Sequence, residues 1–327
     1  MTSSWSSGTG SGHGTVVVRV PASSANLGPG FDSIGLALGV WDECTVTVRE
    51  EPGVRIEVTG SGAGEVPLDE SHLVYRTMVH TWSVLGAAPP RGLELRCHNA
   101  VPHGRGMGSS ATAIVSGIVA AQAVLGLRDG SGRLVDLAVA NDIAAALEGH
   151  PDNSSASIYG GLTLSWTDDE DDERTRTVRA PLHDEVDVVV LVPAVQLSTA
   201  KARSVLPAQV RLGDAARNSA RAALLVHALG HDPSLLLPAT REWLHQEPRR
   251  PAYPSSMALV DRMRAAGHAA VISGAGPSVL VLTTRDAAAS VVGLADSDWT
   301  VLRPGIPQEG ALVTGVGTFA DAAPERP

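Results

Sequence analysis

The stretch Pro102-His103-Gly104-Arg105-Gly106-Met107-Gly108-Ser109-Ser110-Ala111 separates a strand-like run at residues 93–98 from a helix predicted over residues 110–127. Glycines in such a loop let the backbone approach an anion closely. The free amides of the first helical turn, with the positive end of the helix dipole, then hold the anion. The phosphate chain of ATP suits a site of this kind.

Two common phosphate-binding motifs do not fit this stretch. A Walker A loop needs a lysine before the Ser or Thr, whereas Gly108 precedes Ser109 and the only lysine of the chain is Lys201. The Gly-x-Gly-x-x-Gly dinucleotide fingerprint fails as well. The structural alternative is a plain helix-capping turn, which would need neither three closely spaced glycines nor two serines.

The composition limits the classes of protein to which the chain can belong. A length of 327 residues predicts about two domains, and 43% apolar residues are enough for sizeable cores. The net charge of −10 and the 3% aromatic content argue against a nucleic-acid partner. Cys44 and Cys97 are too few for a disulfide framework, so we expect a reducing cytoplasm. No apolar run approaches the length of a membrane span.

Hydrophobic periodicity predicts interleaved strands and helices without a strict β-α-β rhythm, which favours an α+β fold. Residues 1–14 are expected to form a flexible extension, and residues 317–327 a frayed tail. Between them we predict a first domain at 15–170 and a second at 171–316, divided near six consecutive acids at 168–173. Strands are expected at 15–20, 44–49, 54–58, 93–98, 161–166, 186–192, 269–273 and 278–283, and helices at 72–85, 110–127, 134–147, 213–229, 233–245 and 255–266.

Glu148 ends a predicted helix, before the stop signals Gly149 and Pro151. An acid in this position opposes the helix dipole. With Asp152 four residues later, a cation such as Mg²⁺ that bridges phosphates is the simplest compensation. A solvent-exposed glutamate is the alternative, and its position alone does not exclude it.

Taken together, separated segments resemble the GHMP small-molecule kinase superfamily, most closely those members that phosphorylate L-homoserine. The similarity extends over about residues 16–315. It implies an amino-terminal domain like the second domain of ribosomal protein S5, a ferredoxin-like carboxy-terminal domain, and an active site between them. The segments are Val20-Pro-Ala-Ser-Ser-Ala-Asn26-Leu-Gly-Pro-Gly-Phe-Asp32, Gly106-Met-Gly-Ser-Ser-Ala111, Glu148-Gly-His-Pro-Asp-Asn153, Ser198-Thr199-x-x-x-Arg203 and Ile272-Ser-Gly-Ala-Gly-Pro-Ser278.

The resemblance implies a role for each matching residue. Residues that would bind the ATP phosphates are Pro102, His103, Gly104, Arg105, Gly106, Met107, Gly108, Ser109 and Ser110. Ser109 or Ser110 would hold Mg²⁺ with Glu148. Residues implied to bind the substrate are Asn26, Asp32, Asn153, Thr199, Arg203, Arg249 and Gly276. Two guanidiniums suit an amino acid's carboxylate, and Asp32 suits its ammonium group.

The implied reaction is direct in-line transfer of the γ-phosphoryl group of ATP to the hydroxyl of L-homoserine, a step of threonine biosynthesis. Ser110, Glu148 and Asn153 would act at the reacting groups, and we expect no dedicated base because an amide cannot accept a proton at neutral pH. His72 stands where the family often has Asn, near the adenine, and none of the eleven histidines is assigned to the chemistry.

Two other functions stay open. Another GHMP kinase, acting on mevalonate or a sugar, would not need Asp32 to bind an ammonium group. A catalytically silent nucleotide-binding protein is the second alternative, against which the intact Ser109, Ser110 and Glu148 argue. Because homodimers are common in the superfamily, a homodimer is also expected.

Overall fold

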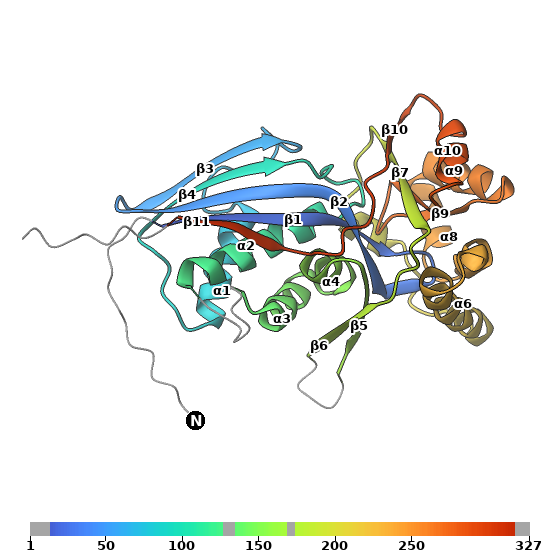
Figure 1. Ribbon diagram of the computed structural model, residues 1–327, viewed down its shortest axis with the longest axis horizontal. Coiled ribbons are helices and arrows are strands. Elements are labelled where there is room, and N and C mark those ends of the chain that lie inside the picture. Colours follow the sequence, from blue (N-terminus) through green and yellow to red (C-terminus); the bar gives the residue numbers. More distant parts are fainter. Residues whose placement is uncertain (1–13, 127–134, 169–173, 318–327) are drawn as a thin grey trace, which may run out of the picture.

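The structure, a computed structural model, describes residues 14–126, 135–168 and 174–317 (Figure 1). The α+β architecture expected from the sequence is confirmed by two sheets with helices packed against them. The predicted extension and tail lie outside the described residues except for positions 14 and 317, and so does most of the acidic run. In these described ranges, no helix is both long and apolar enough to cross a membrane.

The first sheet is built around β2 (Gly30–Arg49), a strand of 20 residues. Its path is β11-β1-β2-β4-β3, and β5 pairs with both β2 and β6. Because β2 pairs with β5 near its start and with β4 over residues 43–49, it connects two distant parts of the sheet. The other strands are β1 (Thr15–Asn26), β3 (Gly53–Gly60), β4 (Gly92–Asn99), β5 (Leu162–Thr167), β6 (Thr175–Ala180) and β11 (Leu312–Gly317).

Helices α1 (Leu73–Val84), α2 (Ser109–Leu125), α3 (Leu137–Glu148) and α4 (Asp152–Tyr159) lie together on one side of this sheet (Figure 1). Alternating residues of β1, among them Val18 and Val20, are buried against them, as period-two side-chain placement requires. Gly117 allows α1 and α2 to pack closely, because a Cβ atom there would lie 2.6 Å from the carbonyl oxygen of Val74.

The second sheet has the order β10-β7-β9-β8, with neighbouring strands antiparallel. Its strands are β7 (Val186–Pro193), β8 (Ala269–Ile272), β9 (Val279–Thr284) and β10 (Trp299–Leu302). Both faces are buried, since Val188 and Val190 share one apolar cluster with Leu225 while Val189 and Leu191 share another with Met257. The helices are α5 (Thr199–Ser204), α6 (Leu212–Gly230), α7 (Leu236–Ala239), α8 (Gln246–Arg249), α9 (Pro254–Ala265) and α10 (Ala288–Gly293), with 3-10 turns at Pro233–Leu235 and Arg250–Ala252.

The two sheets share one apolar cluster. Leu36 and Leu38 of β2 belong to the same buried group as Val188 and Val190 of β7. Burial of this shared surface therefore stabilises the relative position of the two sheets.

Two predictions about organisation need correction. The sheets do not divide near residue 170, because β6 pairs with β5 in the first sheet and β11 returns to pair with β1. The predicted helix at 233–245 is wrong: a 3-10 turn and the four-residue α7 occupy its first part. The carboxylate of Glu242 then accepts hydrogen bonds from the backbone amides of Leu244, His245 and Gln246, which begins a separate helix.

Replacement of Met78 should test the packing of α1 on the first sheet. Met78 is completely buried, so Met78→Ala should lower the free energy of unfolding by about 2–5 kcal/mol. Val84, 55% exposed on the same helix, is the matched control, and Val84→Ala should change that free energy by less than about 0.5 kcal/mol. Urea unfolding followed by circular dichroism measures both, and equal effects of the two variants would contradict the packing described.

Candidate active site

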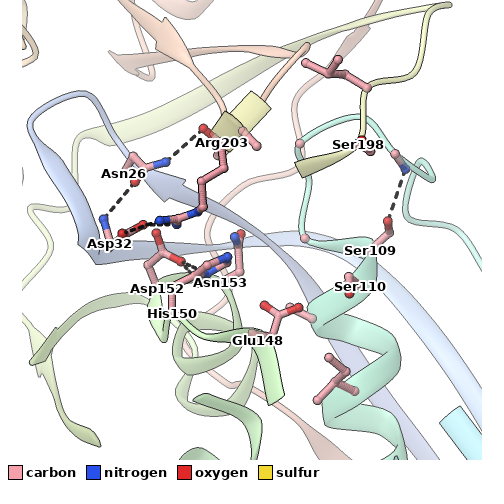
Figure 2. Close-up of a pocket in the computed structure, with 18 of the residues that line it drawn as sticks. Asn26, Asp32, Ser109, Ser110, Glu148, His150, Asp152, Asn153, Ser198 and Arg203 are labelled. Carbon is pink, nitrogen blue, oxygen red and sulfur yellow. Dashed lines mark hydrogen bonds and ion pairs between the residues drawn. The ribbon is translucent and has the colours of Figure 1, made fainter. Parts of the chain in front are cut away.

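A cavity of about 400 Å³ opens between the two halves of the molecule. Figure 2 shows the polar side chains that point into it, from the turn between β1 and β2, the start of α2, the α3–α4 connection and α5. Residues 274 and 275 and Arg249 of α8 complete the lining. Segments far apart in the sequence thus contribute to one site.

The glycine loop, residues 102–108, leads from β4 into α2 and lines one end of the cavity. Gly104, Gly106 and Gly108 have φ values of 65°, 73° and 73°, a region that favours glycine. A Cβ atom at Gly108 would collide with the hydroxyl of Ser23. No side chain caps the start of α2, so its first amides remain available to a ligand beside Ser109 and Ser110.

Buried contacts fix this loop at both ends. One carboxylate oxygen of Asp42 accepts from the amide of Val101 at 2.9 Å, and the other accepts from the hydroxyl of Thr112 at 2.6 Å. Burial raises the pKa of Asp42 while both hydrogen bonds oppose that rise. In the middle of the loop, the hydroxyl of Ser273 donates to the carbonyl oxygen of Gly106 at 2.5 Å.

Some side chains predicted to bind phosphate have other contacts. The guanidinium of Arg105 donates to the carbonyl oxygens of Pro193 and Ala194 at the end of β7 and to that of His103. Met107 is fully buried in the apolar cluster shared by the two sheets. His103 and the loop glycines 104, 106 and 108 do line the cavity, whereas the lining does not include Pro102, Arg105 or Met107.

Glu148 closes α3 beside the start of α2. Glu148 and Ser110 both line the cavity (Figure 2), and burial raises the pKa of Glu148 to about 7. Gly149, with φ 75°, ends the helix in a left-handed conformation and turns the chain toward α4. The described residues contain no group of three or more His, Cys, Asp or Glu side chains placed to hold a metal.

The connection between α3 and α4 contributes a histidine, His150, that was not assigned to the site from the sequence. Nδ1 of His150 lies 3.1 Å from Oδ1 of Asp152, and this hydrogen bond raises the pKa of His150. The same oxygen accepts from the backbone amide of Asn153, whose own side-chain oxygen accepts from Ser23. The NH2 group of Asn153 therefore remains for a ligand in the cavity.

The opposite end of the cavity carries the acid and the arginines predicted to bind substrate. Asn26 and Asp32 have φ values of 69° and 56°, and Oδ1 of Asn26 accepts from the amide of Asp32 at 3.0 Å. Asp32 forms a bidentate ion pair with Arg203, at 2.7 and 3.1 Å (Figure 2). Arg249 is almost completely buried, and its charge has no carboxylate partner within the described ranges.

One predicted substrate residue lies outside the lining of the cavity. Gly276 does not line the cavity, because it packs against the ring of Tyr253, and Gly274 and Ala275 occupy that wall instead. Thr199 begins α5 next to Ser198, whose hydroxyl accepts from the amide of Lys201. His72 is buried at the start of α1, and the lining of the cavity does not include it.

Two family models match the chain. The model of the GHMP kinase N-terminal domain matches residues 72–161, and that of the GHMP kinase C-terminal domain matches residues 220–293. These matches identify the protein as a GHMP kinase. Enzymes of this class use ATP as the phosphoryl donor.

Relatives and solved structures agree with the models. A homoserine kinase of Streptomyces coelicolor is 50% identical, covering 94% of this chain and 96% of the relative. A homoserine kinase structure from Cytophaga hutchinsonii superposes with a TM-score of 0.78 at 26% identity, covering 95% of this chain and 100% of that one. A mevalonate diphosphate decarboxylase from Staphylococcus aureus, 17% identical, covers 93% of this chain and 99% of that one with a TM-score of 0.64, so it shares the fold. The chain therefore belongs to the GHMP kinase superfamily and, within it, to the homoserine kinase family.

A side chain at Gly108 should block the nucleotide end of the cavity. Gly108→Ala forces a left-handed residue and a collision with Ser23, so we expect the dissociation constant for ATP to rise at least about tenfold. Isothermal titration calorimetry measures this constant. Gly213→Ala is the matched control, because Gly213 lies in the first turn of α6 with open space around it. The Gly213→Ala variant should bind ATP with unchanged affinity.

Glu148→Gln should separate metal binding from folding. Loss of the carboxylate should lower Mg²⁺-dependent ADP release about hundredfold or more. The thermal midpoint should not fall, because the neutral amide avoids the desolvation that raises the pKa of Glu148. Glu247→Gln, at an exposed glutamate paired with Arg250, is the control. A near-normal rate with the usual Mg²⁺ dependence in Glu148→Gln would rule out the metal role.

Proposed function

We propose that this protein transfers the γ-phosphoryl group of ATP to the side-chain hydroxyl of L-homoserine and releases O-phospho-L-homoserine, for threonine synthesis. One observation carries the proposal. A single cavity joins an uncapped helix start and glycine loop, suited to phosphates, to an aspartate and two arginines suited to an amino-acid zwitterion. Family membership supports the same conclusion, since relatives of high coverage are homoserine kinases.

The triphosphate would lie along the glycine loop and the first turn of α2. Main-chain amides there bind phosphate oxygens without a lysine. A second cavity, of about 630 Å³, continues beyond Leu73, Ile114 and Leu147, which line both cavities. Its wall along α1 offers apolar and polar side chains to the nucleoside.

The acceptor would bind between Asp32 and the two arginines. Its ammonium group would interact with Asp32, and its carboxylate with Arg203 and the buried Arg249. Bound homoserine would thereby replace the direct Asp32–Arg203 ion pair. Its ammonium group would pair with Asp32 and its carboxylate with Arg203. The acceptor's charges thus complement groups that are already within ion-pair distance.

Transfer would depend mainly on alignment. The attacking hydroxyl would bind beside the NH2 group of Asn153, and the bond from its oxygen to phosphorus would form as the bond to the β-phosphate oxygen breaks. The hydroxyl proton would leave late, to an oxygen of the transferred phosphoryl group or to water. A loose transition state requires little early deprotonation, so positioning and electrostatic stabilisation can suffice without a dedicated base.

Ser110 and Glu148 are the groups that would hold Mg²⁺. They are hard oxygen donors that line the same cavity, and Mg²⁺ takes one or two such protein ligands together with phosphates, so the residues fit the ion. Ser110 is the better candidate of the two serines, because the hydroxyl of Ser109 accepts from the amide of Gly104. When bound, the ion would neutralise charge on the phosphates.

The cytoplasmic location and the homodimer stay predictions. Size-exclusion chromatography with light scattering would measure the mass of the assembly in solution.

A panel of acceptors tests the activity and the substrate class together. With ATP and Mg²⁺, we expect ADP release with L-homoserine and less than about 1% of that rate with mevalonate or a sugar. The carboxylate of mevalonate would draw Arg203 away from Asp32 without supplying an ammonium group in its place, and a sugar has no carboxylate for Arg249. Faster release with either of these acceptors would favour another GHMP kinase activity.

Asp32→Asn should raise the KM for homoserine about tenfold to hundredfold, while the KM for ATP should change little. Asp296→Asn is a matched control, since Asp296 forms an exposed ion pair with Arg262 outside the cavity. An unchanged homoserine KM in Asp32→Asn would argue against the ammonium contact.

A further inference from the structure

His245 lies directly behind the end of the cavity that carries Arg203 and Arg249. It precedes α8, is completely buried, and is stacked on the ring of Phe31 with centroids 5.2 Å apart. Phe31 in turn lies under the guanidiniums of Arg203 and Arg249, at 5.6 and 5.8 Å. The histidine therefore contacts the acceptor-binding elements from the protein side.

Its hydrogen bonds determine which ring nitrogen carries the proton. NH1 of Arg249 lies 3.2 Å from Nδ1 of His245, and a guanidinium can only donate, so Nδ1 is an acceptor. Nε2 lies 2.8 Å from the carbonyl oxygen of Gly28, which can only accept, so Nε2 carries the hydrogen and donates it. Both bonds are satisfied only by the neutral ring with its proton on Nε2.

We propose that His245 is a positioning residue for acceptor binding, which orients the guanidinium of Arg249 toward the cavity and fixes the turn at residues 26–32 beside it. This inference rests on the proposed function, because it assigns the oriented guanidinium to the acceptor's carboxylate. Nε of Arg249 donates to the carbonyl oxygen of Ala202 in α5 at 3.0 Å, so two hydrogen bonds from different elements determine its direction. Arg249 lines the cavity, so a ligand there can reach its guanidinium.

The His245 ring must be neutral because it contacts the positively charged guanidinium of Arg249. Arg249 is buried, and a second positive charge beside it would repel the guanidinium. Burial lowers the pKa of His245, which keeps the ring neutral, although Glu242, whose carboxylate lies 3.9 Å from Nε2, acts in the opposite direction. Asp32 also raises the pKa of His245, and its ion-pair partner Arg203 lies over the ring of Phe31, while the Glu242 carboxylate already accepts hydrogen bonds from backbone amides.

Two variants separate the roles of the ring nitrogens. His245→Asn keeps an acceptor near the position of Nδ1 and loses the donor to Gly28, whereas His245→Gln keeps a donor near Nε2 and loses the acceptor for Arg249. We expect the KM for homoserine to rise about tenfold to hundredfold in His245→Gln and less in His245→Asn. The KM for ATP should stay within about threefold in both. His231→Gln, at an exposed histidine after α6, is the matched control.

A shortened acceptor distinguishes orientation of Arg249 from general damage. 3-Aminopropan-1-ol is homoserine without its carboxylate, and its inhibition constant against homoserine should be the same in wild type and His245→Gln. A loss of affinity that is equal for homoserine and the shortened acceptor would overturn the proposal. So would a lower thermal midpoint with both KM values unchanged, which is what a purely structural role predicts.

The unaltered protein offers a second measurement, which does not depend on how the variants fold. With ¹⁵N-labelled histidine, the NMR shifts of His245 should show a protonated Nε2 and an acceptor Nδ1 at neutral pH. The homoserine KM should rise only below the ordinary histidine pKa of about 6.5. A His245 ring with its proton on Nδ1, or charged at neutral pH, would overturn the proposal. Absence of ADP release with homoserine in wild type would instead overturn the proposed function itself, and the proposal with it.

Discussion

The Asp42 carboxylate is the contact on which the phosphate end of the cavity depends. Three glycines with positive φ make the loop flexible in the unfolded chain, and amides bind an anion well only if they are held in place. Asp42 holds both ends of the loop at once, through Val101 before it and Thr112 after it. A buried carboxylate is costly, but here both oxygens accept hydrogen bonds, and the positive end of α2 lies close by.

The second half of the molecule holds the same loop from the other side. Ser273 donates to Gly106, and the guanidinium of Arg105 binds carbonyl oxygens at the end of β7. The loop is therefore fixed by both sheets, and the cavity between them keeps its shape through hydrogen bonds as well as through the shared apolar cluster. Arg105 contributes to this support through its guanidinium.

Local motifs could be predicted from the sequence, whereas contacts between distant segments could not. The Gly-Ser loop, the end of α3 at Glu148 and the amino-terminal Asn26 and Asp32 each lie in short patterns whose chemistry is visible in the residues themselves. The return of β11 to β1 depends on a pairing between residues about 300 positions apart, for which no local periodicity gives a signal. Likewise, Asp42 and His245 lie in unremarkable stretches and acquire their roles only when β4, α2 and the turn at 26–32 come together.

The two arginines are not equivalent, and their difference determines where acceptor specificity arises. Arg203 is 42% exposed on its side chain and already paired with Asp32, and exposed ion pairs of this kind contribute only about 0.2–1 kcal/mol. Opening that pair to bind the ammonium and carboxylate groups of the acceptor therefore costs little free energy. Arg249 is buried and forms no ion pair with a carboxylate of the described part of the chain, so a ligand carboxylate would compensate a charge that is otherwise desolvated. Discrimination between acceptors with and without a carboxylate should accordingly come from Arg249 and from the groups that orient it.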